Sequence, residues 1–71
     1  MSENKEKLAQ QRAIEVIQFY GGANLARKLG IKHQAVSKWQ KAKIPPFRAV
    51  QISNFNDFEL EWIRPDISFR P

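Results

Sequence analysis

The sequence predicts an all-α fold, a bundle of four to five short helices. Glycines, prolines and asparagines divide the 71 residues into short pieces, and such punctuation favours short helices joined by turns. Apolar residues recur in these pieces at helical spacing, whereas no run of four positions shows the β-branched alternation of a strand. A chain of this length forms one domain, so we expect a single domain with a small core over residues 1–71.

The first two helices are predicted from the spacing of their apolar residues. Five of these share one helical face over residues 4–20. A second helix of barely two turns, over residues 23–29, would end at Gly30, because a residue without a Cβ can turn the chain sharply. The expected buried residues are Ala9, Ala13, Val16, Ile17 and Tyr20 in the first helix, and Leu25, Ala26 and Leu29 in the second.

Two further helices and a tail follow. The third runs from residue 33 to residue 40 or 41, and the fourth from Pro46, a favoured first helical residue, to about residue 53. The tail should contain an extended or turn segment and a helical turn that ends before Pro65. The expected buried residues are Ala35, Val36 and Trp39 in the third helix, and Ala49, Val50 and Ile52 in the fourth.

Positive charge is concentrated in the middle of the chain. The net charge is +5, yet the 41 residues between Glu15 and Asp57 hold seven bases and no acid. Such a stretch is an electrostatic footprint for a polyanion such as nucleic acid. Charge alone is equally compatible with a basic surface that aids solubility or with a helix on a membrane surface.

The spacing within this basic stretch favours nucleic acid. It reads Leu25-Ala26-x-x-Leu29-Gly30-Ile31-x-x-x-x-Val36-x-x-Trp39, which is the pattern of a helix-turn-helix. A small residue lets the two helices cross closely, apolar residues fill the wedge between them, and a glycine makes the tight turn. Any compact helical hairpin shares these needs, but it does not require an open face without acids. That face consists of Lys32, His33, Gln34, Ser37 and Lys38.

Six segments between residues 13 and 67 carry a resemblance to a known family. They are Ala13-Ile14-Glu15, Leu25-Ala26-Arg27-Lys28-Leu29-Gly30-Ile31, Gln34-Ala35-Val36-Ser37-Lys38-Trp39, Ile44-Pro45-Pro46, Gln51-Ile52 and Ile63-Arg64-Pro65-Asp66. On these segments the chain resembles the phage and prophage Cro-type repressors, and among them the YdaS-like branch. The resemblance implies a lambda-repressor-like helix-turn-helix bundle that binds operator DNA with its third helix in the major groove, with the helix-turn-helix at about residues 22–41.

The resemblance also implies roles for individual residues. His33, Gln34 and Lys38 look like base-edge readers: Gln can pair bidentately with adenine, and Lys can donate to O6 and N7 of guanine. Lys32 and Ser37 would touch bases or phosphates. The phosphate candidates are Arg27, Lys41, Lys43 and Arg48.

The chain departs from the family pattern at two positions. Many members carry Gln at the first position of the second helix, where it grips a phosphate, and this chain has Gly22 there. Lys32 stands where Ser, Thr or Asp often caps the third helix, so that helix should begin without a side-chain cap.

The apolar tail, residues 55–71, has two interpretations. Cro-type proteins meet near-palindromic operators as dimers, so we expect a weak homodimer or a dimer formed on DNA, with the tail as its surface. Alternatively the tail completes the core, and Trp62 is equally compatible with both. The dimer-contact candidates are Phe58, Leu60, Trp62 and Ile63, with Phe55, Ile67 and Phe69 in the same tail.

Other functions have less support in the sequence. An antitoxin-like module that keeps a DNA-binding helix-turn-helix and binds a protein partner through its tail is the alternative. With no cysteine and one histidine, we expect no cofactor or metal. Asp57, Glu59 and Glu61 adjoin no nucleophile, so we expect no enzyme. No apolar run approaches the roughly 20 residues of a membrane span, and no apolar signal core begins the chain. The expected location is the cytoplasm of a bacterial host.

Overall fold

The computed structural model describes residues 2–68, and it places the side chains of residues 5–68. This part of the chain forms five helices and no strand, which confirms the predicted all-α class. The helices begin and end within one or two residues of the predicted positions, the usual uncertainty of helix ends. They are α1 (Ser2–Tyr20), α2 (Gly22–Leu29), α3 (His33–Trp39), α4 (Pro46–Ser53) and α5 (Leu60–Ile63).

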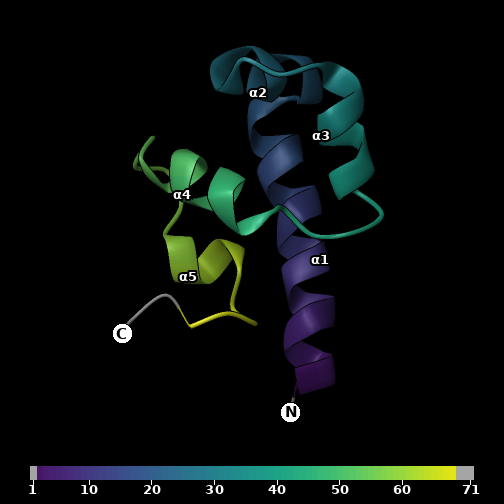
Figure 1. Cartoon of the computed structure of the whole chain (residues 1–71), viewed down its shortest axis with the longest axis vertical. Coiled ribbons are helices and arrows are strands. Elements are labelled where there is room, and N and C mark those ends of the chain that lie inside the picture. The colour runs from purple at the N-terminus through teal and green to yellow at the C-terminus, as the bar shows by residue number, and fades with distance from the viewer. Residues whose placement is uncertain (1, 69–71) are drawn as a thin grey trace.

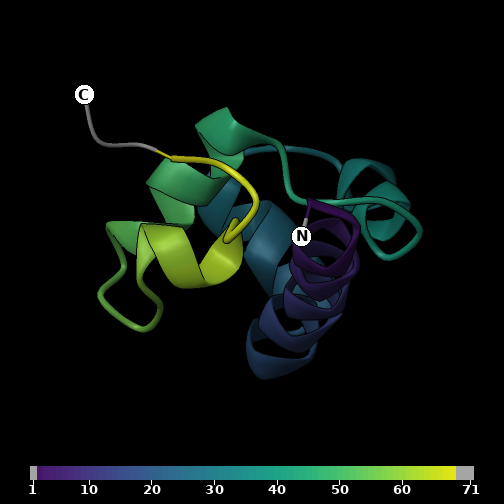
Figure 2. The ribbon, with the colours of Figure 1, turned by 90° about the horizontal axis from the view of Figure 1, so that it is seen from below.

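Helix α1 is the axis of the fold. Helices α2, α3 and α5 pack against it, and α4 packs against α2 and α5. Figure 1 shows α3 on one side of α1 and α4 with α5 on the other, and the segment between α3 and α4 crosses α1. The view from below in Figure 2 shows the same separation. Within the described residues, α3 packs only on α1 and α2, so its outer side faces away from the rest of the fold.

The core agrees with most of the predicted helix faces. The stripe of α1 and the wedge between α2 and α3 are buried as expected except for Tyr20 and Ala35, which are half-buried, and Trp39 is 7% exposed. Val50 is exposed, at 41%, so the prediction that it is buried is wrong. Ala49 and Ile52 point into the core, and a residue one position after Ala49 is turned by about 100° onto the outer side of the helix.

A left-handed residue joins α2 to α3, as predicted. Gly30 has φ 69° and ψ 34°, a conformation that L side chains rarely adopt. The Ile31 N–H donates to the Ala26 carbonyl at 2.9 Å across this turn, which satisfies a carbonyl at the end of α2. The turn therefore sets the direction in which α3 leaves α2.

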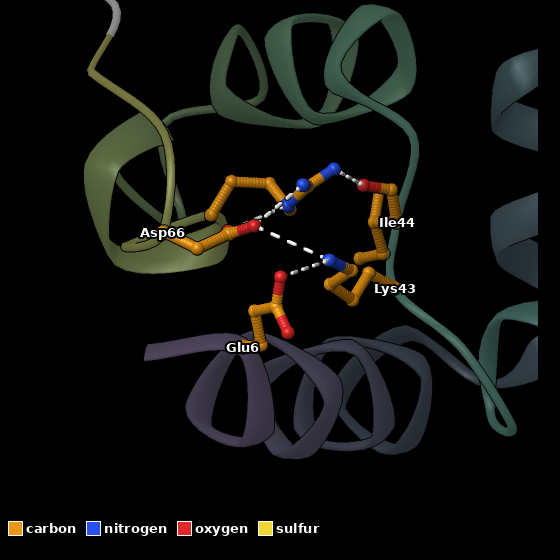
Figure 3. A network of polar contacts seen from close by, with 5 residues as sticks. Glu6, Lys43, Ile44 and Asp66 are labelled. Carbon is orange, nitrogen blue, oxygen red and sulfur yellow. Dashed lines mark hydrogen bonds and ion pairs between the residues drawn. The ribbon is translucent and has the colours of Figure 1, made fainter. Parts of the chain in front are cut away.

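A buried arginine ties the tail to the segment between α3 and α4. Arg64 is 6% exposed, and its Nη1 donates to the Ile44 carbonyl at 2.7 Å. Its Nε and Nη2 donate to the two oxygens of Asp66 at 2.9 and 2.8 Å. This bidentate bond is the main reason that the pKa of Asp66 is lowered to about 2, against the opposing effect of burial. Lys43 Nζ lies 3.4 Å from Asp66 and 3.9 Å from Glu6, between the two carboxylates (Figure 3).

The described part of the tail packs into the body of the protein. Trp62 stacks on Phe58 with ring centroids 5.0 Å apart. The Arg12 guanidinium lies 4.0 Å from the same ring, and Arg12 also donates to the Trp62 carbonyl. Ile63 is fully buried, so its assignment to a dimer contact is corrected: it belongs to the core. Phe69 lies outside the described residues.

We expect the one tyrosine to titrate above its ordinary pKa of 10.0. Burial, then the hydrogen bond from its hydroxyl to Asp57 at 2.8 Å, then the Asp57 charge raise the pKa of Tyr20. Because the folded state disfavours tyrosinate, this contribution to stability is present below pH 10.0 and is lost as pH rises further. Following tyrosinate absorbance against pH checks this, and Asp57→Asn should lower the midpoint. A native midpoint at the ordinary value would contradict it.

Candidate nucleic-acid interface

The outer side of α3 presents four polar side chains without an acid. His33, Gln34, Ser37 and Lys38 are all exposed, whereas Val36 is buried and anchors the opposite side. At about 100° per residue the four exposed positions lie within an arc of roughly 140°. The described tail packs with α1 and α4 rather than with α3, so no described segment covers this arc.

The start of α3 has the character expected from its sequence. Lys32 is exposed and extended, with φ −78° and ψ 148°, and no side chain caps the helix. The first residue, His33, lies against the first residue of α2: a Cβ built on Gly22 would be 2.6 Å from His33 Nε2. At the α2–α3 junction, the imidazole ring therefore fills space that a longer side chain at position 22 would take.

The formal charges on α2, on α3 and on the segment that leads to α4 are all positive. No acid occurs in α2, in α3 or in the segment that leads to α4, because residues 16–56 contain none. The acids lie on α1 or beyond residue 56. A surface of one sign beside an exposed polar helix attracts a polyanion and lets that helix approach it.

Comparison with known families assigns this arrangement. The chain matches the family model P22 Cro, described as DNA-binding transcriptional regulator Cro, over residues 12–62. It belongs to that family. It is therefore a DNA-binding transcriptional regulator of the helix-turn-helix type, and its ligand is double-stranded DNA. No curated protein and no solved structure matches the chain.

Two phosphate candidates of this Cro-type regulator are exposed. Arg27 lies on the outer side of α2, and Lys41 lies in the turn after α3. Neither has an acid in its own helix or turn to neutralise it. Their assignment to phosphates stays a prediction, and their exposure agrees with it.

Two other phosphate candidates have intramolecular partners. Arg48 donates to Gln51 Oε1 at 2.6 Å and lies 5.1 Å from the Phe47 ring. Lys43 is held by Asp66 and Glu6, so a phosphate would have to compete with two carboxylates for it. Lys43 therefore has a structural role that sequence reasoning missed, because both partners are far from it in the chain.

Other features of the Cro-type regulator bear on its partners. The described residues hold no group of histidine, cysteine and acidic side chains able to bind a metal. None of the described helices combines the length and hydropathy of a membrane-spanning segment.

Lys28, on the outer side of α2, points its ammonium toward the Phe55 ring, 4.8 Å away. This contact links α2 to the segment that follows α4.

Proposed function

We propose that this Cro-type regulator is a repressor of a phage or prophage operator and belongs to the YdaS-like branch. The observation that carries the proposal is the acid-free arc of His33, Gln34, Ser37 and Lys38, which stands exposed on a helix fixed by Val36 and Trp39. A helix held in this way can enter a major groove without rearrangement of its own fold.

The chemistry of the arc supports separate roles. Gln34 can donate to and accept from one adenine edge, and Lys38 can donate to O6 and N7 of guanine. His33 can donate or accept according to its tautomer. Lys32 and Ser37 flank these residues and would contact bases or phosphates, while Arg27 and Lys41 would contact phosphates and set the register.

Few base contacts per chain argue for two chains on one operator. Each good bidentate pair is worth roughly 1–3 kcal/mol of discrimination, so a single copy would select its site poorly. We propose a dimer formed on a near-palindromic operator, with half-sites about one helical turn apart. Phe58, Leu60 and Trp62 are half-buried in the described fold, so any contact through them uses only their outer edges.

The packing of the tail also bears on the antitoxin-like alternative. A protein partner bound by the tail would need its apolar side chains to be available. Ile63 is in the core and Trp62 is covered by Arg12 and Phe58. This packing favours the repressor, and co-purification with a neighbouring gene's product would favour the alternative.

Selection of bound duplexes from a random pool tests the proposed function. We expect a near-palindromic consensus. Gln34→Ala should weaken binding to it by about 10-fold, with little change for random duplex, because one bidentate contact carries roughly 1–3 kcal/mol. Gln18→Ala, an exposed glutamine on α1, is the matched control and should change neither. Equal losses on operator and random duplex would contradict base reading by α3.

A further inference from the structure

The absence of a side chain at Gly22 has a specific structural consequence. Gly22 is the first residue of α2 and its φ is not positive, so its backbone does not require glycine. A Cβ at this position would lie 2.6 Å from His33 Nε2 and 3.1 Å from His33 Cδ2. Real Cβ atoms essentially never approach heavy atoms as closely as 2.6 Å. The imidazole therefore occupies space that any other residue at position 22 would take.

The absence of a Cβ at position 22 leaves room for the His33 ring beside the start of α2. The ring is exposed, and within residues 5–68 it has no hydrogen bond or ion pair that would hold it. A Cβ at position 22 would exclude the χ angles that the ring adopts here. Changing the bulk at position 22 would change the direction of the ring without breaking a polar contact.

We propose that Gly22 is a positioning residue for DNA recognition: by lacking a Cβ it seats the His33 ring across the start of α2 and so determines which DNA group His33 contacts. This inference rests on the proposed role of α3 in the major groove. It makes position 22, which itself has no side chain to offer, a determinant of operator preference.

The size of the displacement decides whether it matters. With alanine at position 22, Nε2 must move by roughly 0.8 Å, from 2.6 Å to the 3.4 Å where ordinary van der Waals contact begins. Hydrogen bonds to nitrogen donors fall within about 2.7–3.2 Å, a window of only about 0.5 Å. A hydrogen bond between the His33 ring and a DNA group would therefore be lost or replaced by another. The fold tolerates the change, because an exposed ring can turn away and alanine favours helix more than glycine does.

A double-mutant cycle tests the proposal. Wild type, Gly22→Ala, His33→Ala and the double variant are each titrated with the selected operator and with duplexes changed at single positions. We expect Gly22→Ala to weaken operator binding about 5- to 10-fold, the lower part of what one base contact carries, and to change preference at the position that His33→Ala also affects. In the His33→Ala background, Gly22→Ala should change affinity less than about 2-fold.

A spectroscopic readout separates repositioning from damage to the fold. His33 is the sole histidine of the chain, so its ring protons are assigned without ambiguity by NMR. Gly22→Ala should shift these signals, leave the indole signal of the buried Trp39 in place and keep or raise the urea midpoint.

Three results would overturn the inference. One is an equal loss on Gly22→Ala in both backgrounds, which would mean that the glycine serves close approach of the DNA itself. Another is unchanged binding in the wild-type background, and the third is unchanged histidine signals. Failure of the proposed function is distinguishable, because then Gln34→Ala would also leave operator preference unchanged.

Discussion

Arg64→Met should lower the free energy of unfolding by about 3–5 kcal/mol, the usual cost of removing one partner from a buried ion pair. The substitution keeps a similar volume but leaves the Asp66 carboxylate, 9% exposed, without its bidentate donor. It also leaves the Ile44 carbonyl without the guanidinium bond. A domain of this size has a stability of roughly 4–11 kcal/mol at 0.05–0.15 kcal/mol per residue. The variant should therefore be only marginally folded.

Urea unfolding followed by tryptophan fluorescence measures this effect. Arg27→Met is the matched control, because Arg27 is exposed, and it should stay within about 0.5 kcal/mol of wild type. The double variant Arg64→Met, Asp66→Leu should be more stable than Arg64→Met alone, because it removes the largely buried Asp66 carboxylate, which would otherwise keep only Lys43, at 3.4 Å, of the two basic partners described here. A loss below about 1 kcal/mol would place the Arg64–Asp66 pair among surface ion pairs and would contradict its assignment as a buried pair.

The same network predicts the response to acid. The Arg64 hydrogen bonds lower the pKa of Asp66 from 3.8 to about 2. A carboxyl group with a lowered folded pKa contributes stability above its unfolded pKa, and the contribution is lost as pH falls through the folded value. The loss should therefore occur between about pH 4 and pH 2, and it amounts to about 2 kcal/mol at 1.36 kcal/mol per pKa unit. In Asp66→Asn this part of the acid transition should be absent.

Operator affinity should fall steeply with salt. Each phosphate contact contributes a slope of about −0.9 to log affinity against log salt. Four contacts per chain, from Arg27, Lys32, Lys41 and Arg48, give a slope of about −3.6. A fourfold rise in salt should then weaken binding by roughly 100-fold per chain. A flat response would contradict the basic stretch as the DNA side.

Single variants assign this slope to individual residues. Lys41→Ala should reduce it by about 0.9, because one phosphate contact is lost. Lys7→Ala, an exposed lysine on α1, should leave it unchanged. Lys43→Ala should reduce it less than Lys41→Ala does, since Lys43 is already paired with Asp66 and Glu6.

Sequence reasoning succeeded where the interacting residues are close in the chain. The wedge from Leu25 to Trp39 and the turn at Gly30 lie within fifteen residues, so helical periodicity and one glycine are enough to predict them. The exposed arc of α3 follows from the same periodicity, because burying Val36 and Trp39 leaves the opposite side open.

Features made by distant residues were not predictable in this way. The hydrogen bond from Arg64 to Ile44 joins residues 20 apart, and the one from Arg12 to Trp62 joins residues 50 apart. No local sequence pattern pairs such residues. The prediction that Val50 is buried was wrong because an apolar residue in a short helix does not reveal which side of that helix the rest of the fold covers. The fit of His33 over Gly22 depends on the crossing of α2 and α3, which only coordinates give.

The isolation of α3 from α4, α5 and the described tail has an evolutionary consequence. Because Gln34, Ser37 and Lys38 on its outer side are exposed, substitutions at these positions leave the stability of the molecule nearly unchanged. DNA sequence preference can thus diverge by single steps, each passing through a folded intermediate, as a regulator and its binding sites change together.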